Sequence, residues 1–216
     1  APVELPEWVR KPAPQEPRPA RPLSPSSLGE DKVADPPPTP AMRAAAERGR
    51  LIHALFERLP SVPAADRARA ADRWLADVGQ VGDAAERHAI AEAARRVIDD
   101  PAYADLFGAE ALAEAPISAV LADGTVVAGT VDRLLVTDTT VRVVDFKTGR
   151  QVPRSVDEAP TYHLRQIAAY VAALAVIFPG RAIEAALLYT GGPVLLPLPA
   201  ALLARHKPSY RGAEQS

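Results

Sequence analysis

Two segments of β-branched and aliphatic residues, 125–136 and 141–147, form the clearest pattern of apolar and polar positions in the chain. The polar residues 137–140 separate them, and two such segments around a short polar turn predict a β-hairpin. A third apolar segment at 115–121 is followed by Asp-Gly at 123–124, a strong signal for a tight turn between strands. The pattern therefore predicts three consecutive antiparallel strands.

Helical periodicity lies on both sides of these strands. The first helix, at 39–59, has Thr39 as its N-cap and Pro40 in its first turn, and Pro60 ends it. The remaining predicted elements are helices at 64–78, 83–98 and 161–178, strands at 183–190 and 194–198, and a loop at 149–160. Helices, three strands, a helix and a further strand define a mixed α/β fold.

The strands at 125–136 and 141–147 bring charged residues together. If the turn is centred between residues 138 and 139, Asp132 lies directly across from Asp145, with the Cβ atoms roughly 5 Å apart. Two carboxylates at that distance repel by roughly 3 kcal/mol at an effective dielectric of about 20. Alternation along the strand places Lys147 on the same face as Asp145 and Phe146 on the other face.

A divalent cation between the two carboxylates would turn their repulsion into binding, because hard cations are held by carboxylate and carbonyl oxygens. Lys147 could then orient a water molecule and offset negative charge that develops on a phosphate. The alternative is an exposed strand face with scattered charges. Because Asp132 interrupts an otherwise apolar strand, the metal site is the favoured interpretation.

Composition narrows the class of protein. The chain has 216 residues, enough for one domain of ordinary size with an appendage. It contains no cysteine, which excludes disulfides, zinc–thiolate sites and iron–sulfur clusters. It has no apolar run of about 20 residues and no signal-peptide pattern, so we expect a cytoplasmic location and no membrane partner. The net charge of −2 does not by itself indicate nucleic-acid binding.

Residues 1–38 are rich in proline and poor in apolar residues, which predicts an extended arm or linker. This arm is either a tether or a segment that docks along the domain with Trp8 as its anchor. We expect the folded domain at 39–204 and a frayed tail at 205–216. The sequence begins without methionine, and its single methionine is Met42, so we interpret it as a fragment of a longer protein.

Several motifs carry a resemblance to a known family. Gly-Thr-Val-Asp-Arg-Leu at 129–134, followed by Val-Val-Asp-Phe-Lys-Thr-Gly at 143–149, resembles the core of the PD-(D/E)XK nuclease superfamily. More narrowly, these segments resemble the RecB-type nuclease domain at the C-terminus of bacterial AddA-like helicase–nuclease subunits. Gly-x-x-x-His-x-x-Phe-Glu around His53 resembles the first motif of those domains, and Gln-x-x-x-Tyr at Gln166 and Tyr170 resembles the last.

The resemblance covers roughly residues 22–200 and implies a restriction-endonuclease-like αβββαβ core with extra N-terminal helices. It assigns catalysis to Asp132, Asp145 and Lys147. It assigns Mg²⁺ binding, with Mn²⁺ as a substitute, to His53, Asp132, Asp145 and the backbone carbonyl of Phe146. It assigns DNA contacts to Gln166 and Tyr170, to which we add the neighbouring Arg150 and Arg165. Glu114 is expected outside the ligand set. Without the resemblance, a lone histidine beside an apolar helix face is an ordinary core or surface residue.

The implied function is a metal-dependent DNA exonuclease that hydrolyses single-stranded DNA delivered by a helicase, in double-strand break repair and recombination. No Gly-x-x-x-x-Gly-Lys-Ser/Thr motif occurs, so an ATP-driven motor is expected in a helicase region outside this segment. A second helicase–nuclease subunit is an expected partner. Two alternatives stay open: a non-catalytic nuclease-fold module for DNA binding or assembly, and a solitary small nuclease.

Overall fold

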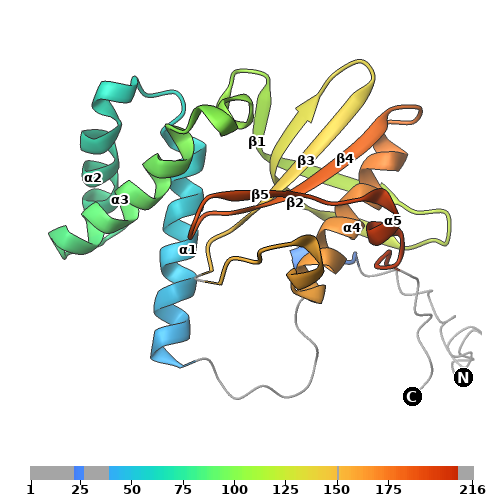
Figure 1. Ribbon diagram of the computed structural model, residues 1–216, viewed down its shortest axis with the longest axis horizontal. Helices are drawn as coiled ribbons and strands as arrows, with labels where there is room; N and C mark the ends of the chain where they lie inside the picture. The colour runs from blue at the N-terminus through green and yellow to red at the C-terminus, as the bar shows by residue number, and fades with distance from the viewer. Residues whose placement is uncertain (1–21, 27–38, 150, 209–216) are drawn as a thin grey trace, which may run out of the picture.

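The structure is a computed structural model that describes residues 22–26, 39–149 and 151–208 (Figure 1). Five strands form one sheet in the order β1-β2-β3-β4-β5. The strands are β1 (Ala111–Val120), β2 (Val126–Val136), β3 (Thr140–Lys147), β4 (Ala182–Tyr189) and β5 (Val194–Pro197). β3 and β4 are parallel, whereas the other neighbouring pairs are antiparallel. The three predicted antiparallel strands are confirmed.

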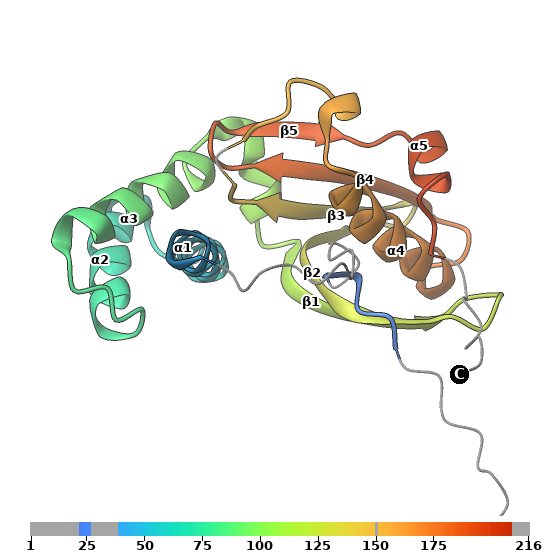
Figure 2. The same cartoon turned by 90° about the horizontal axis from the view of Figure 1, so that it is seen from below.

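The helices cover the two faces of the sheet separately. They are α1 (Pro40–Arg58), α2 (Arg67–Asp77), α3 (Ala84–Ile98), α4 (Thr161–Ile177) and α5 (Ala200–Ala204). One core joins α1, α2 and α3 to the sheet face that carries Val144, Phe146 and Leu188. A second core joins α4 and α5 to the face that carries Val143 and Leu187. Figure 2 shows α4 well away from the group α1–α3. The predicted restriction-endonuclease-like arrangement is confirmed.

Helix α1 begins and ends where its sequence predicts. The Thr39 side chain accepts a hydrogen bond of 3.2 Å from the Met42 N–H, and Pro40 occupies the first turn, where a missing N–H costs nothing. The apolar face of α1 is buried, with Leu55 and Phe56 almost fully covered. Burial of each such side chain contributes about 1.5–3 kcal/mol, so packing rather than propensity holds this helix in place.

Element boundaries differ from the prediction by a few residues at several places. The helix predicted at 64–78 opens with a 3₁₀ turn, Ala64–Asp66, before α2 begins. β1 starts at Ala111, four residues before the predicted start. The short helix α5 has no counterpart among the predicted elements. In the described part of the chain, no helix is long and apolar enough to cross a membrane.

The β2–β3 ladder keeps the predicted register only as far as Arg133. Arg133 pairs with Val144, and the pairs nearer the turn continue that register. Among the described pairs, the next one expected, Asp132 with Asp145, is missing. Instead, Oδ2 of Asp132 accepts a hydrogen bond of 2.6 Å from the Phe146 backbone N–H. The predicted direct pairing of the two aspartates is wrong, because a side chain takes the place of the β2 backbone and the strands diverge.

Part of the proline-rich segment lies against the divergent stretch of β2. Leu23 donates its N–H to the Val126 carbonyl at 2.7 Å and accepts from the Ala128 N–H at 3.1 Å. Pro25 is buried, and a Cβ added at Gly129 would lie only 3.0 Å from its ring. Residues 22–26 therefore pair with the β2 edge that β3 leaves open. The predicted anchor Trp8 lies outside the described residues.

Candidate active site

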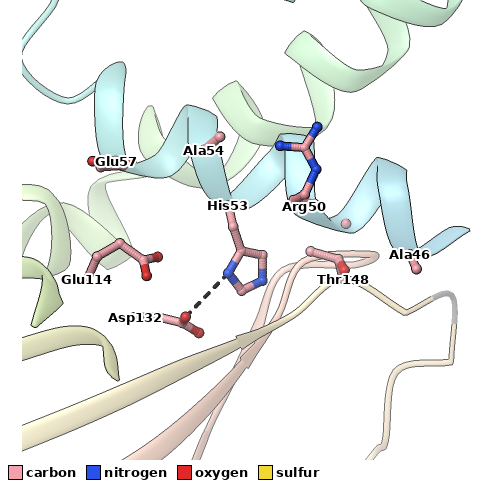
Figure 3. Close-up of a pocket in the computed structure, with 9 residues that line it drawn as sticks. Ala46, Arg50, His53, Ala54, Glu57, Glu114, Asp132 and Thr148 are labelled. Carbon is pink, nitrogen blue, oxygen red and sulfur yellow. Dashed lines mark ion pairs between the residues drawn. The ribbon is translucent and has the colours of Figure 1, made fainter. Parts of the chain in front are cut away.

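Helix α1 and strand β2 hold a histidine against an aspartate. Nδ1 of His53 lies 3.3 Å from Oδ1 of Asp132, while Oδ2 of Asp132 is bound to the Phe146 N–H (Figure 3). The His53 ring also packs edge-on against the Phe146 ring, with the centroids 5.9 Å apart. One carboxylate oxygen of Asp132 therefore links β2 to β3 through a hydrogen bond, and the other faces His53 on α1.

A third side chain with metal-binding capacity comes from β1. Glu114 has a φ of 47°, in the left-handed region that non-glycine residues seldom adopt. It falls between Ala113 and Ala115, which pair with Arg133 and Val131 of β2, on either side of Asp132. One ligand atom from each of His53, Glu114 and Asp132 lies within 4.8 Å of the other two (Figure 3). Strained backbone conformations of this kind concentrate at functional sites. Glu114 therefore joins two of the predicted ligands in one cluster.

The three residues face a pocket of about 530 Å³ that is also lined by α1 and by Thr148, which follows β3. Gly49 allows α1 to approach this point closely, because a Cβ at that position would lie 2.6 Å from Oγ1 of Thr148. Gly49, one turn before His53, therefore leaves room for the Thr148 side chain. The close approach sets the width of the pocket beside the cluster.

On the face of β3 that meets α4, four predicted site residues form one polar network. Nζ of Lys147 lies 2.6 Å from Oδ2 of Asp145 and donates to Oε1 of Gln166 at 2.6 Å. Nε2 of Gln166 donates to Oδ1 of Asp145 at 3.0 Å. It also lies 3.4 Å from the Tyr170 hydroxyl, which donates to the Thr130 carbonyl at 2.7 Å. The spacing Gln-x-x-x-Tyr places both side chains on one face of α4, so both reach the divergent strands.

The electrostatics of the two groups favour a bound cation. Burial raises the pKa of Asp145 to about 6, although Lys147 opposes this effect. Burial alone would lower the pKa of His53, but the hydrogen bond and charge of Asp132 outweigh it and raise that pKa. Burial and the Asp132 charge also raise the pKa of Glu114. Burial is the main cause for the two carboxyl groups and the Asp132 charge adds to it, and a cation bound nearby would lower both pKa values again.

The donor set fits a hard or borderline divalent ion. Carboxylate oxygens suit Mg²⁺, Ca²⁺ and Mn²⁺, and the imidazole of His53 extends the choice toward transition ions. Glu114 and Asp132 supply the two carboxylates. Asp145 is not part of this cluster; its Oδ1 accepts from Gln166, and its buried Oδ2 forms an ion pair with Lys147. Ligation by Asp145 and by the Phe146 carbonyl stays a prediction.

The structure describes one of the two arginines that were predicted to contact DNA. Arg165 is exposed on α4, one residue before Gln166. Arg150 lies outside the described residues. The signal that could have placed Glu114 near Asp132 is the register of the β1–β2 hairpin, in which the neighbours of Glu114 pair with the neighbours of Asp132. Its left-handed backbone conformation has no signal in the sequence.

Comparison with known proteins assigns the chain to a family. A family model for the PD-(D/E)XK nuclease superfamily matches residues 28–200. The chain belongs to the PD-(D/E)XK nuclease superfamily. No curated protein matches it. One similar solved structure is titled "Crystal structure of SSO0001", with 15% identity, 73% of this chain and 81% of that chain covered, and a TM-score of 0.33. That likeness is too distant to refine the assignment.

Proposed function

We propose that this chain is a Mg²⁺- or Mn²⁺-dependent DNA exonuclease that hydrolyses single-stranded DNA, fed to it by a helicase during double-strand break repair and recombination. The observation that carries the proposal is the convergence of His53, Glu114 and Asp132 beside the strand that ends in Lys147. Three metal-binding side chains beside the ammonium group of Lys147 suit the cleavage of a phosphodiester bond.

Each residue then has a distinct task. His53, Glu114 and Asp132 hold the metal, with Asp145 and the Phe146 carbonyl as further ligands. A divalent ion held by these residues would supply an activated water and stabilise negative charge on the scissile phosphate. Lys147 orients the water and offsets charge on the phosphate oxygens. Gln166 and Tyr170 fix Lys147 and the divergent strands, which keeps the ammonium group aimed at the reacting atoms.

Delivery of the DNA by a helicase explains the charge of the chain. Strong binding to a phosphate backbone requires many Lys and Arg contacts, and a net charge of −2 provides little attraction. A helicase region of a longer chain, together with a second helicase–nuclease subunit, would bring the strand to the site. The alternative is a non-catalytic nuclease-fold module, which usually shows loss of a catalytic residue. Asp132, Asp145 and Lys147 are all present.

The test is cleavage of end-labelled oligonucleotides by the native chain, with Mg²⁺ or Mn²⁺ against a chelator. We expect single strands to be degraded in the presence of metal and blunt duplexes to be spared. Asp145→Asn should lower the rate by about 100-fold or more. Asp138→Asn, the same substitution in the exposed β2–β3 turn, serves as the matched control. Metal-independent cleavage, or equal rates for both variants, would refute the proposal.

A further inference from the structure

A second cavity adjoins the candidate metal site at the end of β3. Its volume is about 600 Å³, which lies in the range of small-ligand sites. Lys147 and Thr148 line it, and Thr148 also lines the pocket of the metal site. A nucleotide whose phosphate lies at Lys147 therefore has this cavity within reach of its base.

One wall of the cavity consists of three rings. Tyr162, in the first turn of α4, is 47% exposed. The His163 ring packs against it nearly edge-on, with centroids 4.3 Å apart and planes at 68°. Nδ1 of His163 lies 2.9 Å from the hydroxyl of Tyr189, which is itself buried. An exposed ring is thus held in place by two rings behind it, so its use as a stacking surface costs little conformational entropy.

The described residues that line the cavity carry little net charge. Burial and the nearby Lys147 lower the pKa of His163 to about 3, so its ring is uncharged at physiological pH. Among the described lining residues, Lys147 is the single cation, and it is already paired with Asp145. Glu158 is the single anion there. Away from Lys147, the described lining offers no cation for a phosphate, whereas a nucleobase is a neutral ring with donors and acceptors at its edge. This wall is therefore suited to a base.

We propose that this cavity holds an unpaired nucleobase of the DNA strand, stacked on Tyr162, while the adjoining phosphate lies at Lys147. The inference rests on the proposed nuclease function and adds the feature of the substrate that the enzyme recognises. Bases inside a duplex are already paired and stacked, so a single strand or a frayed end must supply this one. Stacking on an aromatic ring tolerates any base, as a nuclease that degrades DNA of any sequence requires.

The experiment measures stacking directly and without cleavage. Single-stranded oligonucleotides with 2-aminopurine at one of several positions are titrated with the native chain in Ca²⁺, and the loss of fluorescence reports stacking. We expect quenching by the native chain and by Tyr162→Phe. Tyr162→Ala should abolish the quenching and weaken binding by roughly tenfold. Val176→Ala, an exposed position on the same helix, should behave as the native chain does.

An abasic oligonucleotide completes the design. The affinity of the native chain for a strand that is abasic at the quenched position should fall to that of Tyr162→Ala, and the substitution should have no further effect. Absence of quenching by the native chain, or equal quenching by Tyr162→Ala, overturns the inference. Cleavage of the same strands in Mg²⁺ reports the proposed function separately. Quenching without cleavage overturns the nuclease activity alone, and cleavage with unaltered Tyr162→Ala binding overturns the base site alone.

Discussion

Asp132→Asn separates the charge of this side chain from its hydrogen bond. An asparagine amide oxygen can still accept the Phe146 N–H, so the junction between β2 and β3 is retained. The negative charge beside His53 and Glu114 is lost. We therefore expect the substitution to change metal-free stability and metal binding in opposite directions.

The geometry sets the size of the first effect. Carboxylate oxygens of Glu114 and Asp132 that lie within 4.8 Å repel by about 3 kcal/mol at an effective dielectric of about 20. Because Glu114 is exposed, solvent screening reduces this to about 1 kcal/mol. At a pH where His53 is neutral, the attraction of Asp132 to Arg133 opposes this gain, and the repulsion between Asp132 and Asp145 adds to it. The metal-free variant should therefore unfold about 2–4 °C above the native chain, as expected for about 1 kcal/mol in a domain of this size.

The metal should have the opposite effect. A divalent ion at 100 times its Kd stabilises the native chain by about 2.7 kcal/mol, and this gain should vanish in Asp132→Asn. Thermal unfolding followed by circular dichroism, in chelator and in Mn²⁺, measures both quantities, with Asp138→Asn as the control. The reasoning is refuted if the variant gains as much from Mn²⁺ as the native chain. It is also refuted if the metal-free variant is several kcal/mol less stable, because Asp132 would then be a structural anchor.

Three further predictions concern other parts of the chain. Gly49→Ala should push Thr148 aside and slow cleavage about tenfold. The free energy of unfolding in urea should change by no more than about 1 kcal/mol, because alanine favours the helix. In chelator, deprotonation of Asp145 should lower the free energy of unfolding as the pH rises from 3.8 to about 6, because its pKa is raised in the folded chain. Deprotonation of His53, whose folded pKa is also raised, should lower it again above pH 6.5. Urea titrations that show rising stability over this range would contradict the prediction. Thr39→Ala removes the N-cap hydrogen bond of α1, so it should lower the free energy of unfolding by about 1 kcal/mol in the same titrations and leave the cleavage rate unchanged.

Local signals explain how much of the fold can be predicted from the sequence. Thr39 and Pro40 fix the start of α1, and the alternation of Val143, Val144 and Phe146 assigns the two faces of β3. These signals depend on neighbouring residues alone, so one sequence suffices to interpret them. The position of Lys147 on the face opposite Phe146 follows from the same alternation, and the network with α4 agrees with it.

The details of the site depend on interactions that the sequence does not encode locally. A register deduced from a turn assumes that each backbone N–H finds a backbone partner, but Phe146 finds the Asp132 side chain instead. The φ of Glu114, 47°, is uncommon for a residue other than glycine, so no local pattern predicts it. The cavity beside Lys147 is assembled from the loop after β3, the start of α4 and the end of β4, so its shape appears only when these segments are folded together.

The central claim is that His53, Glu114 and Asp132 together hold a divalent cation. Electron spin echo spectroscopy of the native chain with one equivalent of Mn²⁺ tests it most directly, because an imidazole ligand couples its nitrogen to the Mn²⁺ spin. We expect a nitrogen modulation that disappears in His53→Gln while the variant remains folded. Tight Mn²⁺ binding without nitrogen modulation, or modulation that persists in His53→Gln, would contradict it.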